Sequence, residues 1–122
     1  MEKKIVLRIF EIVGSEFCVS ANDGQKVYDQ LALALKKNLQ VQVSFVNITR
    51  LTSAFLNVAI GQLYSEFSSK LIQSNLSVID MDINDRELLN RVIKTAKIYF
   101  EDPARFDKVR NNILGEEADD SN

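Results

Sequence analysis

Hydrophobic and polar residues alternate along residues 40–45, the stretch around which the rest of the chain is organised. Val41, Val43 and Phe45 share one side, and the polar residues between them share the other. This period of two predicts a strand with one face in the core and the other at least partly in water. After a short loop, five apolar residues recur at helical spacing: Phe55, Val58, Ala59, Leu63 and Phe67. They predict a helix from Thr52 or Ser53 to about Ser69 or Leu71.

The residues before this stretch predict a β-hairpin and a helix. Residues 5–13 are rich in β-branched and aliphatic side chains, Gly14-Ser15 interrupts them, and residues 16–20 resume an extended pattern. Asn22-Asp23-Gly24 then supplies cap and turn chemistry for a helix over about 25–38. A hairpin followed by a helix therefore precedes the central strand.

The residues after the central stretch predict a strand over 75–81, a long helix that opens at Asn84 or Asp85, and a short last helix after Asp102-Pro103. The last helix has three apolar residues on one side: Phe106, Val109 and Ile113. The order β-β-α-β-α-β-α-α predicts a small α/β domain. Strands joined by single helices favour right-handed parallel crossovers, and the opening hairpin makes the sheet mixed. The polar side of the central strand predicts that the helices lie mainly on one face of the sheet.

Length and charge predict one domain over residues 1–114 and an acidic tail over residues 115–122. The tail holds four acids and no base, so it is typical of a solvated, disordered segment. Without those four, 13 of the 17 acids remain against 15 bases, too small an excess for a nucleic-acid-binding surface. No run is apolar and long enough to span a membrane, and the first residues do not form an export signal. We therefore expect a cytoplasmic protein.

The chain has no histidine and a single cysteine, Cys18. Histidine-dependent triads, Cys–His nucleophiles and zinc sites of the Cys/His type are therefore excluded. Cys18 lies between apolar neighbours, which predicts a buried structural thiol. The four glycines are scattered, so no glycine-rich phosphate loop of the Walker or Rossmann type is present. We expect no cofactor and no metal.

Three carboxylates, Asp80, Asp82 and Asp85, are the remaining candidates for metal binding or catalysis. The segment from Asp80 begins like a calcium loop, but its sixth position is Asp85 where glycine is needed, and its twelfth is Arg91 where glutamate is needed. Acid–base work by two of them requires environments that separate their pKa values. The sequence indicates no such environments, so an enzyme is the least favoured of the functions considered.

The two hydroxyls of Thr52 and Ser53 stand where a helix begins. Ordinary capping is the simpler interpretation of such residues. A helix start also carries partial positive charge and unpaired N–H groups, so it suits a phosphate or carboxylate, either bound or covalently attached.

The order of elements and the residues after the central strand resemble the STAS domains of bacterial anti-sigma factor antagonists and sulfate transporters. Val46-Asn47 occupies the place of that family's acidic pair, and the segment Thr52-Ser53-Ala54-Phe55-Leu56 that of its Asp-Ser-Ser/Thr-Gly-Leu motif. Thr52 and Phe55 depart from the motif and agree better with the STAS-like family of unknown function, whose members carry a Ser/Thr-Ser-x-Phe pattern. Phe17-Cys18-Val19-Ser20 before a helix also resembles that family, and the resemblance covers about Ile5 to Phe100.

The resemblance implies a regulatory adaptor without catalysis, whose relatives often act with a histidine-kinase-type ATPase. It also implies that Ser53 occupies the position of the family's phosphorylatable serine. We expect a protein partner to dock at the helix start, on a surface made of Ser53, Thr52, Asn47, Thr49, Arg50 and Asn57. The alternative is a sensor that binds a small anionic ligand or nucleotide at the same helix start without turnover. Homodimerisation through a sheet edge or the exposed sheet face is also compatible with the sequence.

Overall fold

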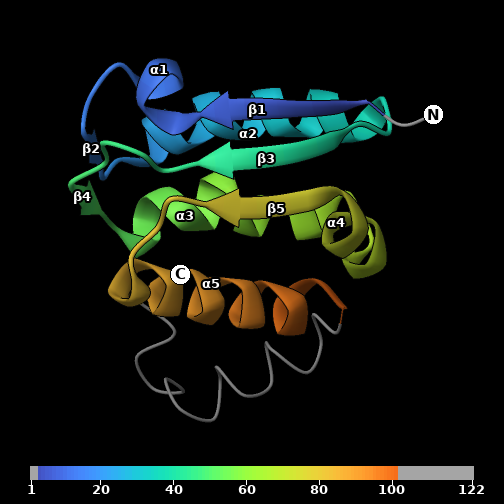
Figure 1. Ribbon diagram of the computed structural model, residues 1–122. Helices are drawn as coiled ribbons and strands as arrows, with labels where there is room; N and C mark the ends of the chain where they lie inside the picture. The colour runs from blue at the N-terminus through green and yellow to red at the C-terminus, as the bar shows by residue number, and fades with distance from the viewer. Residues whose placement is uncertain (1–2, 102–122) are drawn as a thin grey trace, which may run out of the picture.

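The computed structural model describes residues 3–101 and has an α/β fold (Figure 1). The elements in chain order are β1 (Lys4–Arg8), α1 (Ile9–Val13), β2 (Phe17–Cys18), α2 (Ala21–Lys36), β3 (Gln40–Ser44), β4 (Arg50–Leu51), α3 (Ser53–Ala59), the 3₁₀ helix η1 (Gly61–Ser65), α4 (Ser69–Asn75), β5 (Leu76–Ile79) and α5 (Ile83–Glu101). The predicted last helix and the acidic tail lie outside the described residues.

The main sheet has the strand order β1-β3-β5, with β3 in the middle. Both pairings are parallel, and they place Val6 beside Gln42 and Gln42 beside Ser77. A second, two-stranded sheet joins β2 to β4, again in parallel. The predicted α/β class and the parallel crossovers are therefore confirmed.

The predicted β-hairpin at the start of the chain is wrong. β1 ends at Arg8, and the chain turns into α1, which buries Ile9 completely. Gly14 closes this helix in the left-handed conformation, with φ of 79°, and its N–H donates to the Phe10 carbonyl. The next extended residues pair with β4 and not with β1. A short aliphatic run fits a strand or a buried helical turn equally well, and here tertiary packing selects the helix.

The helices α2 and α3 lie behind the main sheet, and among the described residues no helix covers its front (Figure 1). The alternation of β3 explains this arrangement, because Val41, Val43 and Phe45 are buried against the helices. Within residues 3–101, no helix combines the length and the apolar character needed to cross a membrane. The core also takes in residues from the helices: Val27, Leu31, Leu35, Phe55, Leu56, Ala59, Leu63, Ile72, Leu89 and Val92.

Ser44 is buried, although the alternation of the central strand places it on the polar side. Its exposed fraction is 2%. The hydroxyl donates to the Asp80 carboxylate at 2.6 Å and accepts from the Val46 N–H at 3.3 Å. A buried hydroxyl costs little free energy when both its donor and its acceptor are satisfied. Ser44 thus joins the ends of β3 and β5.

The long helix predicted after Thr52 starts where expected but is broken into three pieces: α3, η1 and α4. Ile60 ends α3 with φ of −119°, and the Ser68 hydroxyl caps α4 by accepting the Leu71 N–H at 3.1 Å. The spacing of Leu63 and Phe67 suggested one helix because the chain keeps an α-type turn there, in which the Phe67 N–H donates to the Leu63 carbonyl at 2.9 Å.

Two other helices begin earlier than the sequence predicted. Ser20 caps α2, because its hydroxyl accepts the Asp23 N–H at 3.1 Å. Asp82 caps α5 in the same way, since its carboxylate accepts the Asp85 N–H at 2.8 Å. Both caps follow the usual Ser or Asp chemistry, and the sequence offered several equivalent candidates in a row.

Gly24 lies inside α2, in close contact with α3. A Cβ atom at this position would stand 2.6 Å from the Phe55 carbonyl oxygen and 3.1 Å from the Val58 Cβ. Gly61 differs, because a Cβ there would meet Val92 at 3.5 Å, which is ordinary contact. Gly24 is therefore required by packing, whereas Gly61 has space for a methyl group.

We predict that Gly24→Ala lowers the free energy of unfolding by about 1–3 kcal/mol, because the obstructing atom belongs to the backbone of α3. Gly61→Ala is the matched control and should change it by less than about 1 kcal/mol. Urea denaturation of both variants measures the difference. Equal losses from the two substitutions would contradict the close approach of α2 and α3.

Candidate functional site

The candidate site is built where two parallel strand–helix units begin their helices side by side. β2 leads into α2 and β4 leads into α3, and the β2–β4 pairing sets Phe17 beside Arg50. The Thr52 N–H donates to the Cys18 carbonyl at 3.1 Å, and the Thr52 hydroxyl donates to the Val19 carbonyl at 2.8 Å. These bonds fix the start of α3 against the end of β2.

The neighbouring hydroxyls of Thr52 and Ser53 have different roles. Thr52 is half-buried, and its oxygen also accepts the Phe55 N–H at 3.2 Å, so it is the N-cap of α3. Ser53 is the first helical residue and is exposed, and its hydroxyl has no hydrogen bond to any described residue. The structure therefore assigns Thr52 to stability and leaves the Ser53 hydroxyl accessible.

The other predicted site residues are spread over a wider area. Asn47 is exposed in the left-handed conformation, with φ of 67°, in the loop after β3. The exposed Thr49 hydroxyl donates to the Glu16 carboxylate at 3.0 Å. Arg50 is exposed and forms no ion pair within residues 3–101. Asn57 lies one turn after Ser53 and lines a groove between helices.

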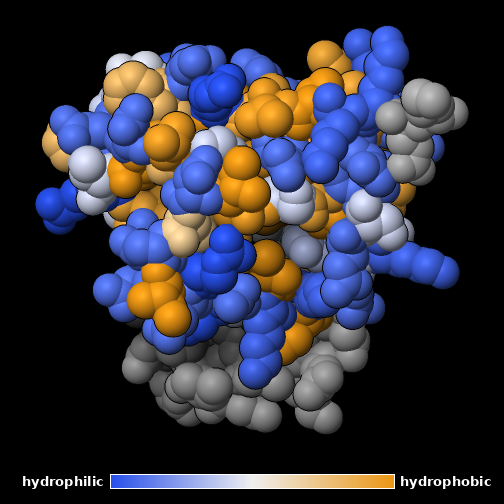
Figure 2. All heavy atoms as spheres, in the orientation of Figure 1, coloured by the Kyte–Doolittle hydropathy of each residue, from blue (hydrophilic) through white to orange (hydrophobic). Residues whose placement is uncertain are grey.

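Sequence reasoning missed the apolar part of this region. Phe10, Phe17, Val19, Val46 and Ile83 are large apolar side chains with substantial exposure, up to 50% for Phe17 and 73% for Ile83. They lie in β2 or just after β1, β2, β3 and β5, at the end to which the strands point (Figure 1). Figure 2 shows hydrophobic atoms among hydrophilic ones at this left-hand end. In open α/β sheets, ligands bind outside the carboxyl ends of the strands.

We call these five apolar residues, together with Asn47, Arg50 and Ser53, the carboxyl-end surface. Clustered exposed apolar side chains with a polar rim are typical of protein interaction sites. The extended pattern at Phe17 and Val19 was visible in the sequence. Their exposure was not, because it depends on the pairing of β2 with β4.

A groove of about 440 Å³ opens between α3, η1 and α5. Polar and apolar side chains line it together, and none of them is charged: Asn57, Val58, Gly61, Gln62, Thr95, Ala96, Tyr99 and Phe100. Because Asn57 follows Ser53 by four residues, the two lie on one side of α3. The groove therefore adjoins the carboxyl-end surface.

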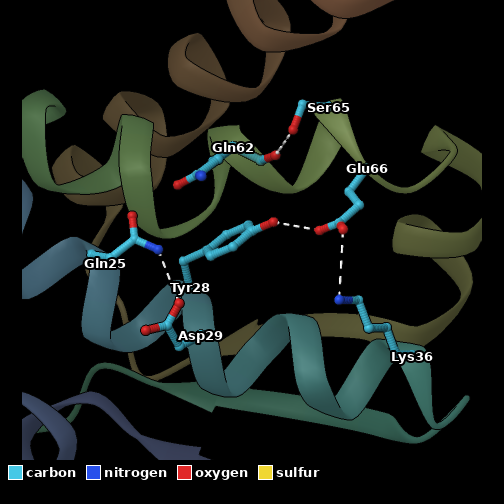
Figure 3. A network of polar contacts seen from close by, with 7 residues as sticks. All are labelled: Gln25, Tyr28, Asp29, Lys36, Gln62, Ser65 and Glu66. Carbon is cyan, nitrogen blue, oxygen red and sulfur yellow. Dashed lines mark hydrogen bonds and ion pairs between the residues drawn. The ribbon is translucent and has the colours of Figure 1, made fainter.

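A network of polar contacts fixes η1, which forms one wall of the groove, to α2 (Figure 3). The Tyr28 hydroxyl donates to the Glu66 carboxylate at 2.5 Å, and the Lys36 ammonium lies 3.6 Å from the other carboxylate oxygen. The bond from Tyr28, followed by the charge of Lys36, holds the pKa of Glu66 below its usual value. Burial and the bond to Glu66 raise the pKa of Tyr28 to about 12.

The acidic residues after β5 support the chain turn and do not converge. Asp80 accepts from Ser44, and Asp82 caps α5. Burial, followed by the nearby charge of Asp82, raises the pKa of Asp85. Among the described residues, no group of three or more Cys, Asp or Glu side chains is placed to hold a metal ion.

Comparison with known proteins identifies one family. The family model described as a STAS-like domain of unknown function (DUF4325) matches residues 23–86, which run from α2 to the start of α5. The match includes Thr52, Ser53 and Asn57 and is shorter than the range from Ile5 to Phe100 expected from the sequence. No curated protein and no solved structure matches the chain.

We predict that Thr52→Val lowers the free energy of unfolding by about 1–2 kcal/mol, since it keeps the side-chain shape but removes the cap of α3 and the bond to Val19. Ser53→Ala, one residue further on, should change it by no more than about 0.5 kcal/mol. Denaturant unfolding of both variants measures the contrast. A larger loss from Ser53→Ala would mean that the two hydroxyls have been assigned the wrong roles.

A second prediction concerns Cys18, which is 0% exposed. Burial, followed by the charge of Asp23, raises the pKa of its thiol from 9.0 to about 12. The folded protein should therefore resist alkylation by iodoacetamide at pH 8 and react rapidly in urea. The pKa of the thiol is higher in the folded protein than in the unfolded chain. Burial of the neutral thiol therefore stabilises the fold fully below pH 9, and this stabilisation is lost as the pH rises towards about 12.

The pH dependence of unfolding in Cys18→Ala isolates this effect, because the variant retains Tyr28, which titrates in the same range. The variant should lose less stability than the wild type between pH 9 and 12. Identical pH profiles, or rapid alkylation of the folded wild type, would contradict the burial of this thiol.

Proposed function

Because the chain belongs to the family of STAS-like domains of unknown function, we propose that it is a regulatory protein–protein interaction module that performs no catalysis itself. Its partner docks on the carboxyl-end surface, and phosphorylation of Ser53 switches the docking. The partner class that the family resemblance favours is a histidine-kinase-type ATPase. Such a partner transfers the terminal phosphoryl group of ATP to the Ser53 hydroxyl, with loss of the hydroxyl proton and release of ADP.

The observation that carries this proposal is the accessible Ser53 hydroxyl beside exposed apolar side chains. Val19 lies next to the helix start, because its carbonyl accepts the Thr52 hydroxyl, and it is exposed like Phe17 in the same segment. Apolar residues of this kind form the buried centre of protein interfaces, and charged groups there are disfavoured. A serine in such a place is neutral until it is modified.

The effect of phosphorylation would be electrostatic. A phosphate on Ser53 adds a charge of about −1.5 to −2 to the carboxyl-end surface. The start of α3 tolerates this charge because its first N–H groups carry partial positive charge. The fold therefore stays intact while the carboxyl-end surface, whose one charged member is Arg50, becomes net anionic.

We predict that a partner recovered by the wild-type protein from native cell extract binds Ser53→Asp at least tenfold more weakly, a difference of about 1.4 kcal/mol. Ser53→Ala should bind as the wild type does, because it adds no charge. Ser74→Asp is the matched control, since Ser74 is an exposed serine in α4, away from the carboxyl-end surface. Mass spectrometry identifies the partner, and titration with each purified variant gives the affinities.

Equal affinity of the partner for the wild type, Ser53→Asp and Ser53→Ala would refute the switch at Ser53. Equal weakening by Ser74→Asp would indicate a general effect of charge. The alternative function, a sensor for a small anion, makes a different prediction: ATP or inorganic phosphate should raise the melting temperature in a saturable way. The docking proposal predicts no such rise.

A further inference from the structure

We propose that the groove between α3, η1 and α5 is the docking site for the chain's own residues 102–114, which follow α5 directly. The groove is formed entirely by described residues and has a volume of about 440 Å³. Its occupant is a short amphipathic segment whose apolar side chains enter the groove. This proposal concerns a different surface from the carboxyl-end surface and does not depend on a switch at Ser53.

The lining of the groove suits the apolar side of a peptide segment. Val58, Ala96 and Phe100 supply apolar surface, and Gly61 adds no side chain of its own to the lining. Asn57, Gln62 and Thr95 add uncharged hydrogen-bonding groups. An interface centre that lacks charge accepts aromatic and aliphatic side chains, with charged residues left at the rim.

The chain leaves the described structure at the end of this groove. Phe100, which lines it, is the penultimate residue of α5, and the Glu101 carboxylate accepts a hydrogen bond from the Ser69 hydroxyl of α4. The end of α5 is therefore held in place. Pro103 disfavours continuation of the helix, so the sequence predicts a change of direction at this point.

The sequence of residues 104–114 matches the groove in pattern and length. Phe106, Val109 and Ile113 fall on one side of a predicted helix, with Lys108 and Asn111 on the other. A helix of these eleven residues would be about 16 Å long, enough to run back along the last turns of α5. Because the segment is tethered beside the groove, its effective concentration there reaches the millimolar range, which favours it over a second copy or a separate protein.

This contact has a consequence for docking that rests on the proposed function. Asn57 lines the groove and lies on the same side of α3 as Ser53. A segment in the groove covers Asn57 but leaves Ser53 and Arg50 exposed. A partner that extends from the carboxyl-end surface onto Asn57 therefore competes with the chain's own segment.

The experiment uses the full chain with a nitroxide spin label attached through Asn112→Cys. Cys18 is fully buried, so the label reacts at the new position alone. We expect the amide NMR signals of Asn57, Gln62 and Thr95 to lose most of their intensity. The signals of Val6 and Ser77, on the uncovered front of the sheet, serve as the reference and should keep theirs. The broadening should not change on dilution, because the contact lies within one chain.

Val109→Asp, made in the labelled chain, should restore the signals of Asn57, Gln62 and Thr95. Asn111→Asp is the matched control, since it adds the same charge on the opposite side of the segment, and it should leave them broadened. Unchanged signals of the β3 residues verify that each variant is folded. Broadening that is absent, spread evenly over the surface or lost on dilution would overturn the proposal, and loss on dilution would indicate a second copy as the occupant.

Discussion

The close packing of α2 on α3 at Gly24 is the constraint on which the rest of the structure depends. The absence of a side chain allows the backbone of α2 to approach the Phe55 carbonyl oxygen, where a Cβ atom would stand only 2.6 Å away. This approach sets the two helices side by side behind the sheet, with their starts at the same end. The Thr52 hydroxyl completes the junction by donating to the Val19 carbonyl.

This junction explains why two neighbouring hydroxyls at one helix start differ in role and in exposure. Thr52 uses its hydroxyl within the fold, as a donor to Val19 and an acceptor from Phe55. Ser53 is therefore not needed for capping, and its hydroxyl remains exposed. A chemical change at Ser53 can alter the surface without removing a bond that holds α3, as the proposed switch requires.

The errors of sequence interpretation share a physical cause. The run from Ile9 to Val13 is aliphatic enough for a strand, but it forms α1 because Ile9 is buried when the chain turns there and Gly14 permits the left-handed closing residue. Leu63 and Phe67 continue the spacing of α3, yet α3 ends at Ala59 and Ser68 opens a new helix. Local spacing does not distinguish these outcomes, since they are decided by what each side chain meets in the folded chain.

The sequence by itself determined the α/β class, the buried side of the central strand and the helix start at Thr52 and Ser53. It could do so because period-two alternation and capping chemistry are local properties of neighbouring residues. Only the tertiary structure decided that β2 pairs with β4, that Phe17 and Val19 are exposed beside Ser53, and that Asn57 belongs to a groove shared with α5. These features arise from contacts between residues more than 30 positions apart in the chain, which no local pattern encodes.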